Sequence, residues 1–194
     1  MREAKVARKT KETAISVELA LDGPGAAKVK TGVGFLDHML DLLAQHGGLA
    51  LTAQAKGDVH VDDHHVVEDM GIVLGQALKK ALANKEGIAR YGWAVVPMDE
   101  ALVMCAVDLG GRPYLSYELS LPAKRVKQFD TELVEEFFRA VVNAAGMNVH
   151  LRQLAGRNTH HVIEAAFKAF ARALGQAVEV SGRVKGVPST KGLL

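Results

Sequence analysis

The chain is poor in cysteine, in aromatic side chains and in long apolar runs, and its opposite charges nearly cancel. Cys105 is the only cysteine, which excludes an intrachain disulfide and favours a reducing compartment. No stretch approaches the roughly 20 apolar residues that a membrane-spanning helix needs. The charged start of the chain contains no apolar signal core. We therefore expect a cytoplasmic protein, with Cys105 as a small core residue.

The charge balance limits the kinds of partner. The 24 lysines and arginines face 22 aspartates and glutamates, so the formal net charge is only +2. Such a balance argues against a broad surface for nucleic acid or membrane, and any anion site must come from a few focused cations. The 194 residues fit a single domain, 1–194, that is long enough to bury a sizeable core.

Hydrophobic periodicity predicts alternating strands and helices. Period-two alternation indicates strands at 15–21, 49–53 and 149–151, and in a strand-rich stretch 93–120 that is broken near 97–100 and 110–111. Helical spacing predicts helices at about 35–45, 62–83, 130–146 and 158–178. The last residues, GVPSTKGLL, look irregular.

The second half of the chain repeats the first. LLAQHGGLALTAQA followed by a helix with DDHHVVED matches VVNAAGMNVHLRQLA followed by a helix with NTHHVIEA. This pattern predicts an internal duplication with pseudo-repeats at about 1–87 and 88–194. Two such halves predict an α+β fold in which helices pack on one face of mixed β-sheets, a plan also found in ribosomal proteins.

The repeated pentad His-His-x-x-Glu is the feature that indicates chemistry. It contains four of the eight histidines, and its residues are His64, His65, Glu68, His160, His161 and Glu164. On a helix, residues four apart share a face, whereas adjacent residues diverge by about 100°. The first histidine and the glutamate of each pentad can therefore bind one metal, while the second histidine points elsewhere. The simplest arrangement is reciprocal, with each second histidine completing the set of the other repeat.

Two further histidines precede the pentads, His38 on a helix and His150 on a strand. Adding one to each set gives three imidazoles and one carboxylate per metal, which suits a six-coordinate divalent transition ion with two open positions. Closed structural zinc sites more often use cysteine, which is not available here. His46 and His60 receive no role.

A helix that directs ligands in two directions does not readily complete both sites within one chain. Sites shared between subunits would solve this geometry, so we expect a homo-oligomer whose assembly depends on metal. The alternative, that these histidines are merely solvated or structural, is disfavoured because the pentad occurs twice in matched surroundings.

The sequence resembles the imidazoleglycerol-phosphate dehydratase family along nearly its whole length. The segments that carry the resemblance are GFLDHML (34–40), GDVHVDDHHVVEDMGIVLGQAL (57–78), MDEAL (98–102), DLGGRPYL (108–115), NVHLRQLAGRNTHHVIEAAFKAFARAL (148–174) and PSTKG (188–192). The chain shows no phosphatase domain, so the resemblance is to the monofunctional form.

The resemblance implies a lyase of histidine biosynthesis with two manganese ions in each active site. One ion would be bound by His38, His65, His160 and Glu164, and the other by His64, Glu68, His150 and His161. The family also implies a hollow particle of twenty-four chains with active sites at subunit contacts.

The implied reaction dehydrates D-erythro-imidazoleglycerol phosphate to imidazole acetol phosphate. Metal at a ring nitrogen favours the imidazolate, which expels the chain hydroxyl to give a diazafulvene-like intermediate. Glu12 matches the family's acid/base carboxylate. The phosphate-binding positions of the family are matched by Arg90, Arg112, Lys168, Ser189 and Lys191, and we expect the tail to close over the substrate.

Two other functions fit parts of the pattern. A dinuclear phosphoesterase would share metal and phosphate groups, but such sites are usually richer in aspartate. A non-catalytic RNA-binding module would share the fold, but the near-neutral charge disfavours it. Asp99 and Glu100 are interpreted as turn residues and are left out of the catalytic set.

Overall fold

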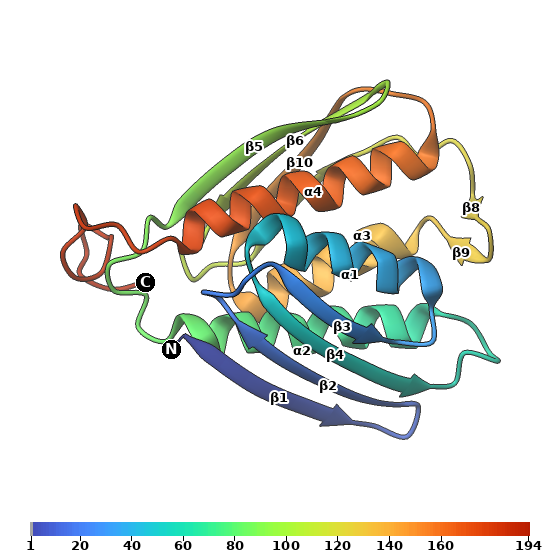
Figure 1. Ribbon diagram of the computed structural model, residues 1–194, viewed down its shortest axis with the longest axis horizontal. Coiled ribbons are helices and arrows are strands. Elements are labelled where there is room, and N and C mark those ends of the chain that lie inside the picture. The colour runs from blue at the N-terminus through green and yellow to red at the C-terminus, as the bar shows by residue number, and fades with distance from the viewer. Residues whose placement is uncertain (1) are drawn as a thin grey trace.

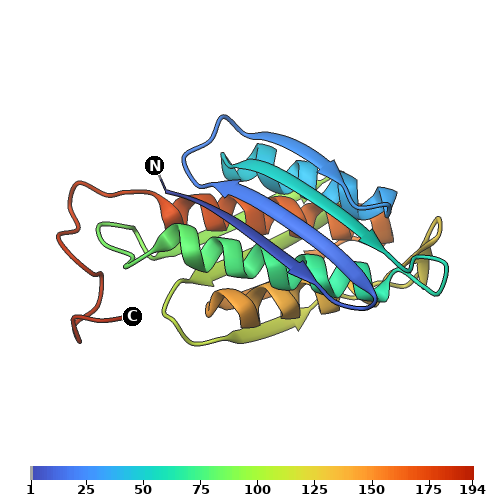
Figure 2. The same cartoon turned by 90° about the horizontal axis from the view of Figure 1, so that it is seen from below.

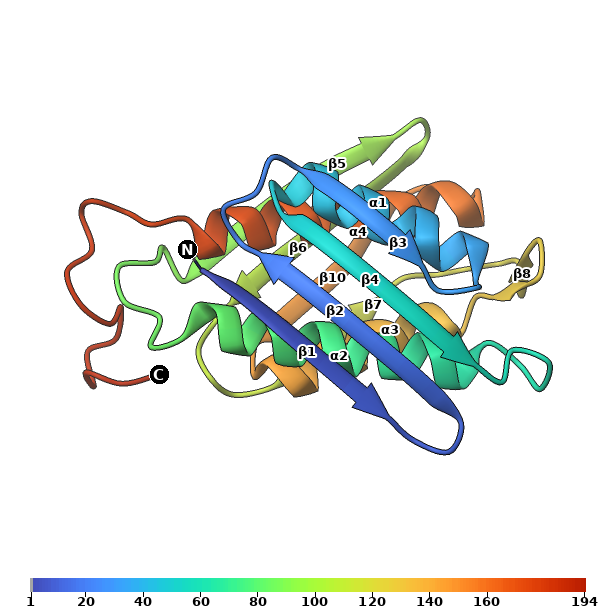
Figure 3. The ribbon, with the colours of Figure 1, turned by 60° about the horizontal axis from the view of Figure 1, so that its bottom comes forward.

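The first half of the chain forms a four-stranded sheet from strands that bury alternate residues. In the computed structural model, which describes residues 2–194, β2 buries Ile15, Val17 and Leu19 and leaves the residues between them partly or fully exposed. The order in the sheet is β1-β2-β4-β3, with β3 parallel and β2 antiparallel to β4 (Figure 3). The strands are β1 (Glu3–Lys9), β2 (Thr13–Ala20), β3 (Ala26–Lys30) and β4 (Ala50–Gly57).

The second half repeats this topology. Its sheet has the order β5-β6-β10-β7. Strand β10 corresponds to β4, because it lies between an antiparallel strand, β6, and a parallel strand, β7. Its strands are β5 (Tyr91–Met98), β6 (Ala101–Asp108), β7 (Tyr114–Glu118) and β10 (Asn148–Ala155), and a small ribbon of β8 (Arg125–Val126) and β9 (Phe129–Asp130) is inserted. The expected α+β duplication is confirmed, while the division near residue 87 stays a prediction.

The four helices of residues 2–194 fill the space between the two sheets (Figures 1 and 2). They are α1 (Gly34–Gly47), α2 (His64–Leu82), α3 (Leu133–Ala145) and α4 (Thr159–Val178). Helix α2 covers β1 and β2 and packs against α3, while α4 covers β5 and β6 and packs against α1. Each helix of one half therefore pairs with a helix of the other, and the inner face of each sheet is covered, as predicted.

Aromatic residues fill the core of the second half, and small residues join the two halves. The rings of Phe138 and Phe167 lie 4.8 Å apart between α3 and α4, and both side chains are buried. Gly71 and Gly75 let α2 approach α3 closely, because a Cβ at Gly75 would lie 2.6 Å from the carbonyl oxygen of Val141. Buried Cys105 is the expected core residue, and burial raises the pKa of its thiol.

The sequence prediction missed the short strands β8 and β9 and two strands of the first sheet, β1 and β3. Strands β1 and β3 lie at the edges of the first sheet, where one side of the strand has no neighbour. Of the residues of β1 only Ala4 is fully buried, and β3 has none, so neither segment carries a strong apolar alternation. The helices of residues 2–194 include none that is long and apolar enough to cross a membrane.

Candidate metal centre

The three helices that carry predicted ligands begin at the same end of the molecule (Figure 1). At the start of α4, the side chain of Asn158 accepts hydrogen bonds from the backbone N–H groups of His160 (3.0 Å) and His161 (3.3 Å). This cap fixes both histidines in the first turn. At the start of α2, Asp62 accepts a hydrogen bond from the N–H of His64 (2.9 Å).

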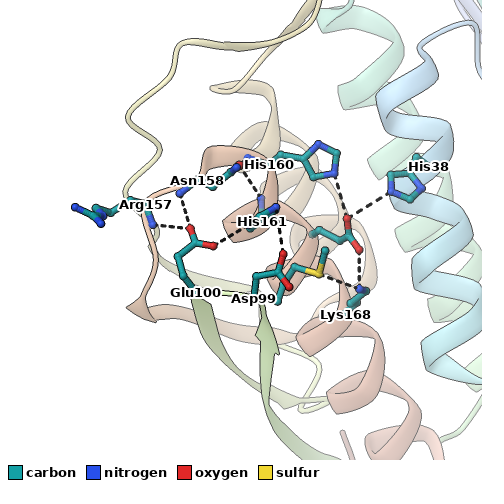
Figure 4. Close-up of polar contacts among 10 residues, drawn as sticks. His38, Asp99, Glu100, Arg157, Asn158, His160, His161 and Lys168 are labelled. Atoms are coloured by element: carbon teal, nitrogen blue, oxygen red, sulfur yellow. Dashed lines mark hydrogen bonds and ion pairs between the residues drawn. The ribbon is translucent and has the colours of Figure 1, made fainter.

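His38, His160 and Glu164 converge between α1 and α4. Oε2 of Glu164 lies 3.1 Å from Nε2 of His160 and 3.6 Å from Nε2 of His38 (Figure 4). Among residues 2–194 this is the group of three histidine or acidic ligands whose atoms all lie within 4.8 Å of one another. Two imidazoles and a carboxylate are donors that suit a divalent transition metal, so the cluster could hold a metal ion.

Lys168 is the other partner of Glu164. Its Nζ lies 2.6 Å from Oε1 of Glu164, one further turn along α4. Burial opposes ionisation of Glu164, but the hydrogen bond and charge of Lys168, with His160 and His38, outweigh it and lower the pKa of the carboxyl. The Glu164 side chain is only 9% exposed, whereas His38 and His160 are 46% and 41% exposed. The cluster thus combines a buried anion with two accessible imidazoles.

A groove leads to this cluster from the side of the β8–β9 ribbon. Its walls include Phe35, His38, Lys127, Phe129 and His160. The ring of Phe35 packs edge-on against His160 at 5.3 Å between centroids, which holds the imidazole at the rim. A small ligand in the groove can therefore reach both imidazoles.

The first pentad forms only a pair. Nε2 of His64 lies 3.7 Å from Oε2 of Glu68, and both side chains are partly exposed. The ring of His65 turns away to Asp58, whose carboxylate oxygens lie 3.1 and 3.2 Å from Nδ1. The hydrogen bond to Asp58 raises the pKa of His65, and the charge of Glu12 adds to the effect.

The second histidine of the other pentad also binds a carboxylate. Nδ1 of His161 lies 2.7 Å from Oε2 of Glu100, in the hairpin between β5 and β6 (Figure 4). The hydrogen bond raises the pKa of His161. The same bond, with two backbone N–H groups, lowers the pKa of Glu100 to about 2. Asp99 is more distant, with Oδ2 at 3.7 Å from Nε2 of His161.

His150 lies apart from all of these residues. It is exposed on β10, between buried Val149 and Leu151, so it points to the face of the sheet that α4 does not cover. Its nearest aromatic neighbour is Tyr114, at 5.5 Å between ring centroids. The structure therefore does not bring His150 to the other predicted ligands of its own chain.

The predicted phosphate-binding residues also lie in separate parts of the chain's fold. Arg90 donates to Asp108 (2.7 and 3.1 Å) and to the carbonyl of Pro188 (2.9 Å), so it lies against the tail that carries Ser189 and Lys191. The backbone N–H of Arg90 bonds Ala177 in the last turn of α4. His160 is in the first turn of this 20-residue helix, which spans about 30 Å.

The remaining two residues of that set lie in different places. Lys168 sits with Glu164, whereas Arg112 is exposed in the turn between β6 and β7, next to Gly111, which lies close to Leu194 at the end of the tail. Glu12 is exposed in the hairpin between β1 and β2, where its backbone N–H bonds the hydroxyl of Thr10. One chain therefore separates its metal cluster from most of the predicted phosphate ligands.

Sequence reasoning missed the two carboxylates that hold His65 and His161. Glu100 was interpreted as a turn residue, and Asp58 received no role. Each contact joins a helix to a separate hairpin or loop, so neither follows from spacing along one helix. The one available signal was the presence of both residues in segments that carry the family resemblance.

Comparisons with known proteins agree with the fold and identify the family. The family model described as imidazoleglycerol-phosphate dehydratase matches residues 31–174. The chain is similar to the imidazoleglycerol-phosphate dehydratase of Desulforamulus reducens (61% identity, covering 100% of this chain and 98% of that one). It is similar also to that of Geobacter sulfurreducens (58% identity, covering 100% and 99%).

Two solved structures share the fold. The crystal structure of imidazoleglycerol-phosphate dehydratase from Staphylococcus aureus has a TM-score of 0.84 at 47% identity, covering 92% of this chain and 99% of that chain. That of IGPD from Pyrococcus furiosus has a TM-score of 0.85 at 38% identity, covering 97% and 100%. The chain therefore belongs to the imidazoleglycerol-phosphate dehydratase family, hydro-lyases that dehydrate imidazoleglycerol phosphate in histidine biosynthesis.

Proposed function

We propose that this chain converts D-erythro-imidazoleglycerol phosphate to imidazole acetol phosphate with two manganese ions in each active site. The observation that carries the proposal is the convergence of His38, His160 and Glu164 beside an open groove. The reaction proceeds through a deprotonated imidazole ring and a diazafulvene-like intermediate, because the hydrogen that is lost does not lie beside a carbonyl group.

The donors present fit a transition metal. His38, His160 and Glu164 would hold one ion, with His65 as the fourth ligand, and His64, Glu68, His150 and His161 would hold the other. When bound, manganese supplies positive charge that lowers the pKa of the substrate ring and fixes a chain hydroxyl. Neutral imidazoles and a buried carboxylate favour such an ion over Mg²⁺, which prefers an all-oxygen set.

The separation of ligands within one chain supports sites built between subunits. His150 lies on the far face of the sheet from α4, and His65 is turned toward Asp58. Neighbouring chains would supply the missing ligands, so we propose a homo-oligomer with active sites at its subunit contacts. The number of subunits, twenty-four, rests on the family resemblance alone.

Glu12 is proposed as the acid/base residue. Its carboxylate is exposed at the tip of the first hairpin and acts electrostatically on His65, so it lies near a proposed metal ligand while remaining accessible to substrate. A protonated carboxyl there can give its proton to the departing hydroxyl, which leaves as water, and the resulting carboxylate can then accept the proton of the neighbouring chain carbon. The chain's other site residues bind and orient the substrate, which removes orientational entropy from the reaction.

The phosphate is assigned to Arg90, Arg112, Lys168, Ser189 and Lys191. Arg90 already contacts the tail through Pro188, so the guanidinium and the tail residues Ser189 and Lys191 can close on one phosphate together. Lys168 lies at the metal end and Arg90 at the tail end, so the phosphate ligands of one site come from different chains. We propose a cytoplasmic location, which rests on the sequence alone.

The decisive experiment measures metal content and product together. Purified protein should contain manganese and form ketone, lose both after thorough chelation, and regain both when manganese is returned. Phosphate release is assayed in parallel, because a dinuclear phosphoesterase would liberate phosphate without forming ketone. Full dehydratase activity in chelated protein would refute the proposal.

A further inference from the structure

The two histidines of each pentad have different kinds of partner. The first histidine lies beside the glutamate one turn further on its own helix, His64 beside Glu68 and His160 beside Glu164. The second histidine is bonded by a carboxylate from outside its helix, His65 by Asp58 and His161 by Glu100. These two bonds use Nδ1 of the ring in both cases.

The bonds made by Glu100 determine which nitrogen of His161 carries a proton. Oε1 of Glu100 accepts from the backbone N–H groups of Arg157 (3.1 Å) and Asn158 (2.7 Å). Oε2 lies 2.7 Å from Nδ1 of His161. An ionised carboxylate only accepts hydrogen bonds, so Nδ1 must be the donor. In the neutral ring Nε2 then keeps its lone pair, which is the form that binds a metal.

The neighbouring carboxylate does not compete for this role. Oδ2 of Asp99 lies 3.7 Å from Nε2 of His161, beyond hydrogen-bond distance, and the Asp99 side chain is 73% exposed. The ring is therefore held on one side, by Glu100, while Asp99 lies too far from Nε2 to bond it.

The duplication explains why the two halves use different carboxylates. Glu100 is the last residue before β6, and Glu12 is the last residue before β2, the matching strand of the first half. In the second half this hairpin glutamate bonds the histidine. In the first half Asp58 takes that bond, and Glu12 is left free for proton transfer.

We infer that Glu100 is a positioning residue, which fixes His161 with its proton on Nδ1 and directs Nε2 toward the metal, and that Asp58 does the same for His65. This inference rests on the proposed ligand roles of His161 and His65. It predicts that the charge of Glu100, and not only its side-chain oxygen, is required for metal binding.

Glu100→Gln tests this requirement. The glutamine oxygen can still accept the N–H groups of Arg157 and Asn158, but its NH₂ group only donates. Nδ1 must then accept, which moves the ring proton to Nε2. We expect the Mn²⁺ affinity of the assembled protein to fall by about 10- to 100-fold, with the Tm of the chelated protein close to that of the wild type. Asp58→Asn should weaken Mn²⁺ binding in the same way.

The variants Glu100→Ala and His161→Ala set the limits of the experiment. Glu100→Ala removes all three bonds, so it should weaken Mn²⁺ binding and also lower the Tm of the chelated protein. If Glu100 only held the hairpin against α4, Glu100→Gln would bind Mn²⁺ with wild-type affinity and Glu100→Ala would not. That result would overturn the inference. A matched control, Glu135→Gln, removes an exposed glutamate that pairs with Arg139 on α3 and should bind Mn²⁺ normally.

Failure of the inference is distinguishable from failure of the proposed function. If His161→Ala loses Mn²⁺ affinity while Glu100→Gln binds as the wild type does, the ligand role stands and the positioning role of Glu100 is wrong. If His161→Ala itself binds Mn²⁺ as the wild type does, the proposed ligand set is wrong, and the inference falls with it.

Discussion

Nε2 of His160 and Oε2 of Glu164 lie 3.1 Å apart, one turn from each other on α4. We predict that Glu164→Gln lowers manganese content and reduces dehydratase activity by more than about 100-fold, because a neutral amide replaces a charged ligand. Metal analysis and ketone formation measure the two effects. Glu135→Gln, which breaks only the exposed pair with Arg139, should change neither, and a Glu164→Gln enzyme with full manganese and activity would exclude this residue as a ligand.

Glu12→Gln separates proton transfer from binding. The amide cannot accept the proton of the substrate, so we expect kcat to fall by about 100- to 10,000-fold. Manganese content and KM should change little, because Glu12 is not assigned to metal or phosphate. Glu18→Gln removes an exposed glutamate that pairs with Lys5 on the outer face of the same sheet, and it serves as the control. Near-normal turnover in Glu12→Gln would remove this residue from the mechanism.

Removal of residues 186–194 should raise KM for the phosphorylated substrate by about 10- to 100-fold, as expected when charged hydrogen bonds to phosphate are lost. The tail contacts Arg90 through the carbonyl of Pro188, so its removal also takes one hydrogen-bond partner from this guanidinium and leaves the two bonds to Asp108. Steady-state kinetics measure the change, and the double variant Ser189→Ala, Lys191→Ala should reproduce most of it. Lys185→Ala, exposed earlier in the tail, is the control. An unchanged KM after the deletion would refute the proposal that the tail closes over the substrate.

The pH dependence of stability should reverse when manganese is present. Hydrogen bonds to Asp58 and Glu100 raise the folded-state pKa of His65 and His161, so in chelated protein their stabilisation is full below about pH 6.5 and is lost as pH rises through the folded pKa. Manganese requires neutral imidazoles, so its stabilisation is lost as pH falls.

Thermal unfolding between about pH 6 and pH 8, with chelator and with manganese, checks this prediction. The Tm of the chelated protein should decline slightly with rising pH, because both pairs are partly exposed to solvent, while that of the manganese-loaded protein should rise. Parallel trends in the two series would show that manganese does not bind through these imidazoles.

Gly75→Ala should destabilise the chain although alanine is the better helix former by about 1 kcal/mol. The new Cβ would lie 2.6 Å from the carbonyl oxygen of Val141, and backbone atoms of a packed helix cannot move aside cheaply. We expect a loss of about 1–3 kcal/mol in the free energy of unfolding, measured by urea denaturation. Gln76→Ala, at the exposed position next to it, should have little effect. Equal stability of Gly75→Ala and the wild type would show that α2 and α3 can separate.

Sequence patterns predicted the helices better than the edges of the sheets. Helices α1, α2 and α4 lie within a few residues of the predicted ranges, because each buries a continuous apolar stripe. Strands β1 and β3 escaped prediction because an edge strand has little apolar surface to bury. The duplication was visible, but the interlocking of α2 with α3 and α1 with α4 depends on contacts between the halves that no local pattern encodes.

The candidate site shows the same division between local and distant contacts. The pairing of His160 with Glu164 follows from helical spacing, and the structure shows this pair in contact. The approach of His38 to Glu164 requires α1 to cross beside α4, and the bond between Glu100 and His161 requires a hairpin to fold over a helix end. Spacing along one segment carries no information about such contacts.

The position of Arg90 at the last turn of α4 and of His160 at its first turn has a consequence for the enzyme in dilute solution. In an isolated subunit, the metal ligands and Arg90 would lie about 25 Å apart, which is farther than so small a substrate can span. Catalysis then becomes a collective property. Below the concentration at which chains associate, the activity per chain should fall steeply, whereas it would stay constant if each chain worked alone.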